Sequence, residues 1–198
     1  MKAQFILELL EDGDLKLLKE LAEKEVLEQF EKQKGNAKLL SAVRKMMKNK
    51  ALPEYSVGYS LVNDKYYFTD GYRLLESPSN LGFGALAKPL NVEGVTPRFE
   101  GKIAEVDILE LQMVIRENKE IIKRNKQIKK EYKGTVEIKK PYLQLKQFII
   151  NNEIAFNPVY MMEMIEATGT NIIHYENPLC ACYFGDNHRN LLLPVRIK

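Results

Sequence analysis

The sequence predicts an α+β protein in which helices are followed by antiparallel strands. Apolar residues recur at helical spacing in three long stretches, residues 4–33, 37–48 and 106–130. Short runs rich in β-branched and aromatic residues, separated by turn residues, lie between and after these stretches. The chain of 198 residues is long enough to bury a core, as one domain or as two small ones.

Composition indicates a soluble globular protein. Hydrophobic residues make up 45% of the chain and charged residues 29%, and no apolar run approaches the ~20 residues that span a bilayer. The N-terminus leads into an acidic helical stretch and not into a signal peptide. Cys180 and Cys182 are too few for a disulfide framework, and their spacing suits neither a bridge nor a zinc pair. We expect both to be reduced, on one strand and facing the same side, which favours a cytoplasmic location.

Charge is unevenly distributed along the chain, although its net value is only +3. Residues 1–34 carry six basic and nine acidic side chains, a balance of −3. Residues 37–50 carry five basic and no acidic side chains, and residues 119–140 carry nine basic and three acidic ones, a balance of +6. Concentrated basic segments favour an anionic partner, of which nucleic acid is the commonest, although each segment could also be a solvated charged face.

The first half of the chain predicts two helices and a hairpin. Residues 4–33 are expected to be helical with a break near residue 13 and a cap at Asp14, although residues 5–10 could instead be a first strand. A second helix should run from Ala37 to about Lys48. Two strand-like runs, residues 55–62 and 65–68, flank the turn residues Asn63-Asp64.

The second half predicts a connector, a long helix and a closing strand-rich unit. Residues 77–104 are rich in Gly and Pro. The helix from Val106 to about Lys130, ended by Gly134, carries a heptad-like apolar stripe: Leu111, Val114, Ile115, Ile121, Ile122 and Ile128. Residues 135–138 and 142–148 alternate as half-buried strands, and Asn151-Asn152 forms a turn.

The closing unit begins with a strand at residues 153–156. Asn157 can cap the following helix, Pro158 suits its first position, and Gly169 can end it with a positive φ. Three strand-like runs follow, and the last, residues 191–197, is apolar and interrupted by Pro194. Taken alone, this final run could simply be a strand of a sheet.

Two groups of motifs resemble a known family. The first is Phe156-Asn157 with Tyr160, together with the closing run Leu193-Pro194-Val195-Arg196-Ile197. The second is Thr69-Asp70-Gly71-Tyr72-Arg73-Leu74, which follows a helix, a strand, a turn and a strand. Both are similar, in the same order, to motifs of the bacterial DNA polymerase III beta subunit, the sliding clamp. Tyr72 stands where that family usually has histidine. The segment at residues 95–99 resembles the one before the family's last domain.

The resemblance implies a DNA-clamp-like fold with an extra N-terminal helical segment. Residues 36–75 and 157–195 share one order of cap, helix and three strands, and a clamp domain is built from two such units. We therefore expect a helical segment at 1–34, a reduced clamp-like module with connector at 35–100 and a C-terminal clamp-like module at 101–198. A single clamp-like domain with a helical insertion is the alternative. Because a ring needs six clamp domains, two modules per chain would require a homotrimer and one a hexamer.

The resemblance also implies two binding sites and a function. Peptide motifs of polymerases and repair proteins would dock in a pocket formed by Thr69, Gly71, Tyr72, Arg73, Leu74, Tyr160, Leu191, Leu193, Pro194, Val195 and Arg196. Basic residues on helix faces would contact the phosphates of duplex DNA without reading bases: Lys38, Arg44, Lys45, Lys48, Arg116, Lys123, Arg124 and Lys130. The expected function is a replication processivity or recruitment factor, in a shortened form that would suit a phage or mobile-element gene.

Other functional classes are less favoured. His174 is expected in a strand, and His188 with Asp186 in a turn; this pair could ligate a metal, but a surface turn is the simpler interpretation. No phosphate-binding loop, nucleophile elbow or paired catalytic acids occur, so we expect neither an enzyme nor a cofactor. A clamp-derived adaptor or decoy that binds peptides without encircling DNA is the first alternative. A basic nucleic-acid-binding protein unrelated to clamps is the second.

Overall fold

The computed structural model describes residues 15–48, 58–83, 101–132 and 142–197. It contains helices and antiparallel strands, so the predicted α+β class is confirmed. The chain divides into two compact units: residues 1–71 with 76–90, and residues 72–75 with 91–198. Residues 72–75 thus belong with the C-terminal part, while the division predicted at residues 34 and 100 stays a prediction.

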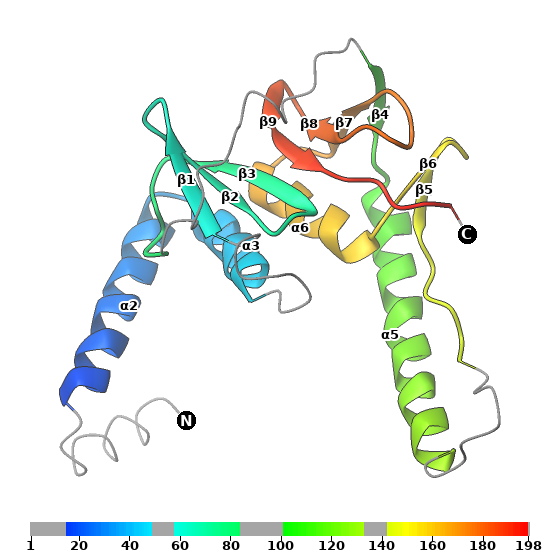
Figure 1. Ribbon diagram of the computed structural model, residues 1–198, viewed down its shortest axis with the longest axis horizontal. Coiled ribbons are helices and arrows are strands. Elements are labelled where there is room, and N and C mark those ends of the chain that lie inside the picture. Colours follow the sequence, from blue (N-terminus) through cyan, green and yellow to red (C-terminus); the bar gives the residue numbers. More distant parts are fainter. Residues whose placement is uncertain (1–14, 49–57, 84–100, 133–141, 198) are drawn as a thin grey trace. The chain divides into compact units, whose positions relative to one another are not determined.

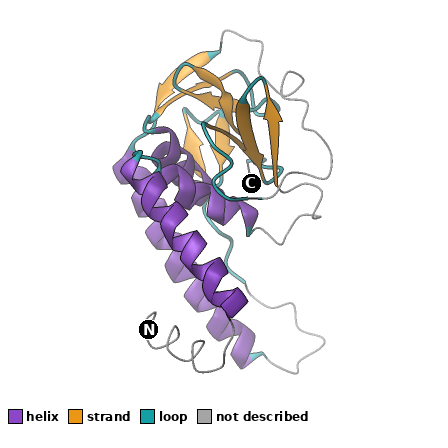
Figure 2. Ribbon diagram, turned by 90° about the vertical axis from the view of Figure 1, so that its left-hand side faces the viewer, coloured by secondary structure: helices purple, strands orange, loops and turns teal. Residues whose placement is uncertain are grey.

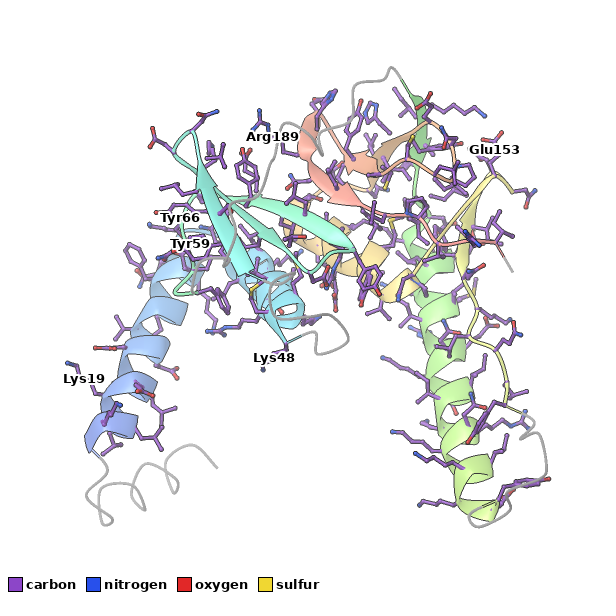
Figure 3. The ribbon with its side chains drawn as sticks, in the orientation of Figure 1. Lys19, Lys48, Tyr59, Tyr66, Glu153 and Arg189 are labelled. Carbon is purple, nitrogen blue, oxygen red and sulfur yellow. The ribbon has the colours of Figure 1, made fainter. Side chains whose placement is uncertain are left out.

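The described residues of the first unit form two helices and a hairpin: α2 (Leu15–Gln33), α3 (Ala37–Met47), β1 (Gly58–Val62) and β2 (Lys65–Thr69). Asn63 and Asp64 both have positive φ and join Val62 to its partner Lys65, so the predicted hairpin turn is confirmed. Asparagine and aspartate tolerate this conformation better than other non-glycine residues. Tyr59 and Tyr66, labelled in Figure 3, place their rings 5.5 Å apart across the hairpin.

The helix α3 supplies the apolar surface that packs on β2. Leu40, Val43 and Met46 are buried, at the helical spacing that the sequence predicts. At the N-terminus of α3, Asn36 does not cap the helix with its side chain. Its amide donates instead to the buried carboxylate of Glu31 at 2.8 Å, which fixes the corner between α2 and α3.

The second unit contains the remaining elements (Figure 1): β3 (Arg73–Ser77), β4 (Lys102–Glu105), α5 (Ile108–Glu131), β5 (Phe148–Ile150), β6 (Ile154–Phe156), α6 (Pro158–Thr168), β7 (Ile172–Tyr175), β8 (Cys182–Phe184) and β9 (Asn187–Leu192). The last two residues of β3 belong to the first unit. Here the strand order is β3-β9-β8-β7-β4, with antiparallel neighbours, and β5 pairs with β6 separately. Figure 2 draws these strands in orange.

The helix α6 packs on this sheet through β8 and β9. Its predicted termini are confirmed: Asn157 caps the helix, Pro158 occupies the first turn, and Gly169 ends it with φ +74°. Met161 and Met164 are fully buried, so the core of this unit lies between α6 and the sheet.

Several strand predictions are wrong in detail. Residues 142–147 form no strand, because their backbone bonds to side chains of α5 and only Phe148–Ile150 pairs as β5. The final run is not one strand: β9 ends at Leu192, and Val195 makes an isolated bridge to Ala155 of β6.

The predicted positions of three single residues are also wrong. Cys180 precedes β8 and does not share that strand with Cys182, and His188 lies in β9 and not in the preceding turn. On α5, Ile122 of the predicted apolar stripe is exposed, whereas Asn118 is buried. The predicted break and cap before residue 15, the strand at 135–138, the helix end at Gly134 and the segment at 95–99 lie outside the described residues.

The order of one helix followed by three strands occurs twice, as α3-β1-β2-β3 and as α6-β7-β8-β9. The clamp-like repeat and the clamp-like fold both stay predictions. Among the described helices, none is long and apolar enough to cross a lipid bilayer.

Candidate functional site

The chain's end lies beside the turn at residue 72. β3 and β9 pair with Arg73 opposite Leu192 and Leu74 opposite Leu191. Directly beyond this ladder, the N–H of Leu193 donates to the carbonyl oxygen of Tyr72 at 2.9 Å. Two motifs that are far apart in the sequence therefore meet in one place.

The ring of Tyr160, on α6, lies next to the ring of Tyr72. The Asn157 cap accepts hydrogen bonds from the N–H groups of Val159 and Tyr160, at 3.0 and 3.3 Å, which orders the first turn of the helix. The rings of Tyr160 and Tyr72 are 5.9 Å apart and tilted by 40°. Tyr72 is 40% exposed and Leu193 is 43% exposed. We call Tyr72, Tyr160 and Leu193 the tyrosine patch.

Arg73 supports the tyrosine patch and does not form part of its exposed surface. Its guanidinium is buried in an ion pair with Glu163 of α6, and its central carbon lies 4.1 Å from the centre of the Tyr160 ring. Cation–π contacts of this kind contribute from ~0.5 to ~2 kcal/mol, with the larger values at desolvated sites. The ion pair and the ring contact together fix Tyr160 against β3. Sequence reasoning missed Glu163, which gave no sign of facing inward.

The remaining residues predicted for the peptide pocket are either buried in the sheet or part of the C-terminal tail. Leu74 and Leu191 are buried in the sheet. The tail is anchored by its backbone, because the N–H of Val195 donates to Ala155 O at 2.8 Å and Gln147 Nε2 donates to Arg196 O at 2.7 Å. Pro194 is half-buried between these contacts and Leu193.

Thr69 and Gly71 belong to the first unit, and the other predicted pocket residues belong to the second. The N–H of Gly71 donates to Thr69 Oγ1 at 3.0 Å, and Gly71 has φ +77°. The predicted tight turn at Asp70-Gly71 is therefore present, and its positive φ explains the glycine.

A cationic cavity lies along α3. It has a volume of about 360 Å³ and is lined by Lys32, Ala37, Leu40, Ser41, Arg44, Lys45 and Lys48. Three of the four cations predicted on this helix face line it; Lys38 is exposed outside the lining. Lys32, from the last turn of α2, and Ser41 were not predicted. Figure 3 labels Lys48 beyond the end of α3.

The predicted cations of α5 (Arg116, Lys123, Arg124 and Lys130) are all exposed. Lys123 pairs with Glu120 at 2.6 Å, so part of the basic charge on this helix is offset locally. Lys146, on the segment beside the helix, pairs with Glu117 at 3.0 Å. Exposed pairs of this type contribute ~0–1 kcal/mol and are weakened by salt.

Two asparagines of α5 hold an extended segment by its backbone. Asn118 Oδ1 accepts from Lys146 N at 2.7 Å, and its Nδ2 donates to Lys146 O at 2.8 Å. Asn125 makes the same pair of bonds with Leu143, at 2.9 and 2.8 Å. Seven helical residues rise ~10.5 Å and three extended residues span ~10 Å, so the two spacings match. In Figure 1 this segment, drawn in yellow, runs alongside α5.

A polar network joins β4, β7 and the β5–β6 turn. Lys102 Nζ donates to both carboxylate oxygens of Glu153, each at 2.7 Å, and the Tyr175 hydroxyl lies 3.4 Å from Glu153 Oε2. The hydrogen bond from Lys102 holds the pKa of Glu153 below its ordinary value of 4.5, and the same bond raises the pKa of Lys102. Figure 3 shows Glu153 at the edge of this unit.

The two histidines stack on one tyrosine ring. His174 and His188 lie on either side of the Tyr183 ring, with centres 4.4 and 4.1 Å away. In the part of the chain that the structure describes, no group of three or more metal-ligating side chains occurs. Cys182 is buried, and burial raises the pKa of its thiol far above the ordinary value.

Known proteins provide no further guide to the function. Comparisons with protein families, with curated proteins and with solved structures found no match. The structure offers two candidate sites: an exposed aromatic patch at Tyr72, Tyr160 and Leu193, and a cationic cavity along α3.

Proposed function

We propose that this protein is a sliding-clamp-like recruitment factor. It docks short peptide motifs of polymerase-type partners on the tyrosine patch and holds duplex DNA non-specifically through cationic helix faces. The observation that carries the proposal is the hydrogen bond between Leu193 and Tyr72, because it joins the two motifs that resemble the clamp family.

The tyrosine patch has the chemistry of a peptide-docking surface. Two tyrosine rings and a leucine offer apolar area with few rotatable bonds, and the phenol hydroxyls can bond to a peptide backbone. Binding surfaces of this kind draw most of their affinity from a few anchor residues surrounded by a polar rim. The buried Arg73–Glu163 pair supports the patch by fixing Tyr160 before a peptide arrives, which lowers the entropy cost of docking.

The DNA-binding part of the proposal depends on charge. Lysine and arginine side chains attract phosphates irrespective of sequence, and removing one cation that binds a phosphate should lower the salt dependence of binding by about one unit of slope. Helix α3 carries Lys38, Arg44 and Lys45, Lys48 caps its C-terminus, and residues 37–48 include no acidic residue.

The peptide site can be tested by fluorescence anisotropy with a labelled peptide that carries the clamp-binding motif. Tyr72→Ala and Leu193→Ser should each weaken binding at least tenfold, since each removes an exposed anchor. Tyr142→Ala and Leu145→Ser are matched controls, because these residues are 46% and 50% exposed on the segment beside α5. They should change the affinity by less than twofold.

The peptide-site proposal would be wrong if the patch variants and the controls lost affinity equally. It would also be wrong if the peptide bound neither the unchanged protein nor any variant. Point variants are preferable to deleting the last five residues, because that deletion also removes the contacts of Val195 and Arg196 with Ala155 and Gln147.

DNA binding separates this function from a peptide-only adaptor. Affinity for a duplex should fall steeply between ~50 and ~200 mM salt. Replacing Lys38, Arg44, Lys45 and Lys48 by glutamine should lower both the affinity and the slope. A monomeric mass in solution with no duplex binding at low salt would favour the adaptor.

A further inference from the structure

We propose that α5 is a dimerisation helix whose pairing face is occupied in the single chain. We call residues 142–147, which run beside α5 in Figure 1, the strap. The face of α5 that holds the strap can instead pair with the same face of α5 in a second copy, so the strap is an autoinhibitory contact. This self-association does not depend on the peptide binding or the DNA binding proposed above.

Burial along α5 follows a seven-residue repeat. Every residue at the b, c and f positions of this repeat, between residues 112 and 130, is exposed. Apolar residues in this pattern are typical of helices that pair as a coiled coil. Leu111 is fully buried within its own unit, so the pairing face runs from Val114 to Ile128. The residues at the a and d positions are all buried or half-buried: Leu111, Val114, Asn118, Ile121, Asn125 and Ile128.

Two asparagines stand at a positions, where a covered amide must be hydrogen-bonded. In the single chain the strap bonds both amides through its backbone, Lys146 with Asn118 and Leu143 with Asn125. In a parallel, in-register coiled coil, an asparagine at position a faces the same residue of the partner, and the two amides can bond to each other. A second copy of α5 therefore matches this face at both amides and at the apolar d positions.

The strap is held in a way that allows its release. Residues 142–146 are exposed, so the strap buries little apolar surface of its own. Four hydrogen bonds with the two asparagines hold its backbone, and an exposed ion pair joins Lys146 to Glu117 at 3.0 Å. Segments with few buried apolar contacts open more readily than the core of a fold.

The strap and a second copy compete for the same amides. The strap belongs to the same chain, so its contact is independent of protein concentration, whereas pairing with a second copy is not. Valine and isoleucine at d suit a parallel pair less well than leucine, and Arg124 at g would face Lys129 of the second copy at e. The strap therefore occupies the face at low concentration, and pairing is weakened by the small fraction of chains in which the face is free.

Releasing the strap should strengthen self-association. In the double variant Leu143→Pro with Lys146→Pro, each proline removes an N–H that donates to an asparagine, while α5 is unchanged. Sedimentation equilibrium should show a dimer dissociation constant at least tenfold lower than that of the unchanged protein. Gln144→Pro is the matched control, because both asparagines bond to other residues of the strap.

Two further substitutions in the double variant locate the interface. Ile121→Lys places a charge at a d position and should restore the monomer, whereas Gln127→Lys, at an exposed c position, should not. With Cys180 replaced by serine, Ile128→Cys should form a disulfide between copies on oxidation, because a parallel pair brings this residue next to its counterpart. Lys126→Cys, at an exposed b position, is the control and should not.

Hydrogen exchange in the unchanged protein is a readout that no substitution affects. As protein concentration rises, exchange of the Leu143 and Lys146 amides should become faster and exchange in α5 slower, because pairing displaces the strap. If circular dichroism showed the double variant to be unfolded, exchange rates that did not change with concentration would overturn the proposal.

The remaining outcomes concern the folded variants. The proposal would be wrong if the double variant associated no more tightly than Gln144→Pro. Equal effects of Ile121→Lys and Gln127→Lys, or cross-linking through residue 126 in place of residue 128, would put the contact on another surface and overturn it as well.

Discussion

Replacing Arg73 by methionine tests the support beneath the tyrosine patch. The side chain is buried, pairs with Glu163 and lies against the Tyr160 ring. Methionine keeps the length and apolar character of the stem but removes the charge and the donors. Glu163 would then be a buried carboxylate without its guanidinium.

The expected loss follows from the burial of the pair. Removing one partner of a buried ion pair costs ~3–5 kcal/mol, because the remaining charge has lost its solvation without gaining a partner. Because the total free energy of unfolding of a typical protein is ~5–15 kcal/mol, this loss would be a large fraction of the stability. For a chain of this size, it corresponds to a decrease in Tm of roughly 10 °C. Replacing both residues, by Arg73→Met and Glu163→Leu, should restore most of the loss.

Urea unfolding followed by far-ultraviolet circular dichroism measures these free energies. Arg124→Met is the matched control, because Arg124 is exposed on α5 and should cost no more than ~0.5 kcal/mol. A loss below ~1 kcal/mol for Arg73→Met would refute the reasoning. So would a double variant whose loss equals the sum of the two single losses.

Two further predictions concern the second unit. Asn118→Ala should lower the free energy of unfolding by ~1–3 kcal/mol, because the two hydrogen bonds between the buried Asn118 amide and Lys146 are lost. Hydrogen exchange in residues 142–147 should also become faster. Gln127→Ala, at an exposed position of the same helix, is the control and should change neither quantity. Because the pKa of Glu153 is lowered in the folded protein, its pairing with Lys102 stabilises the fold above pH ~4.5 and is lost as the pH falls through the lowered value. Glu153→Gln should therefore flatten the acid side of the stability–pH curve, and an unchanged curve would argue against the pairing.

Local signals predicted the helix termini and turns well. Asn157, Pro158 and Gly169 act through backbone chemistry that depends on their immediate neighbours, and the same is true of the turn at Asn63-Asp64. The meeting of Tyr72 with Leu193 was expected only through the family resemblance, because no local pattern joins residues so far apart.

The predictions failed where a side chain, and not a strand, satisfied the backbone. Residues 142–147 alternate like a strand, yet Asn118 and Asn125 take the hydrogen bonds that a neighbouring strand would have supplied. Their spacing of seven residues was a readable signal, since it places both amides on one face of α5. Arg73 and Glu163 gave no such signal, because burial of a charged pair depends on tertiary packing.

The division of β3 between the two units has a practical consequence for dissecting the protein. A fragment that begins at residue 91 would lack Arg73 and would expose the edge of β9, with Glu163 deprived of its cation. A fragment that ends at residue 90 would carry residues 72–75 without β9, the strand that pairs with Arg73 and Leu74. Either cut would separate β3 from β9, so the tyrosine patch should be assayed in a chain that contains both strands.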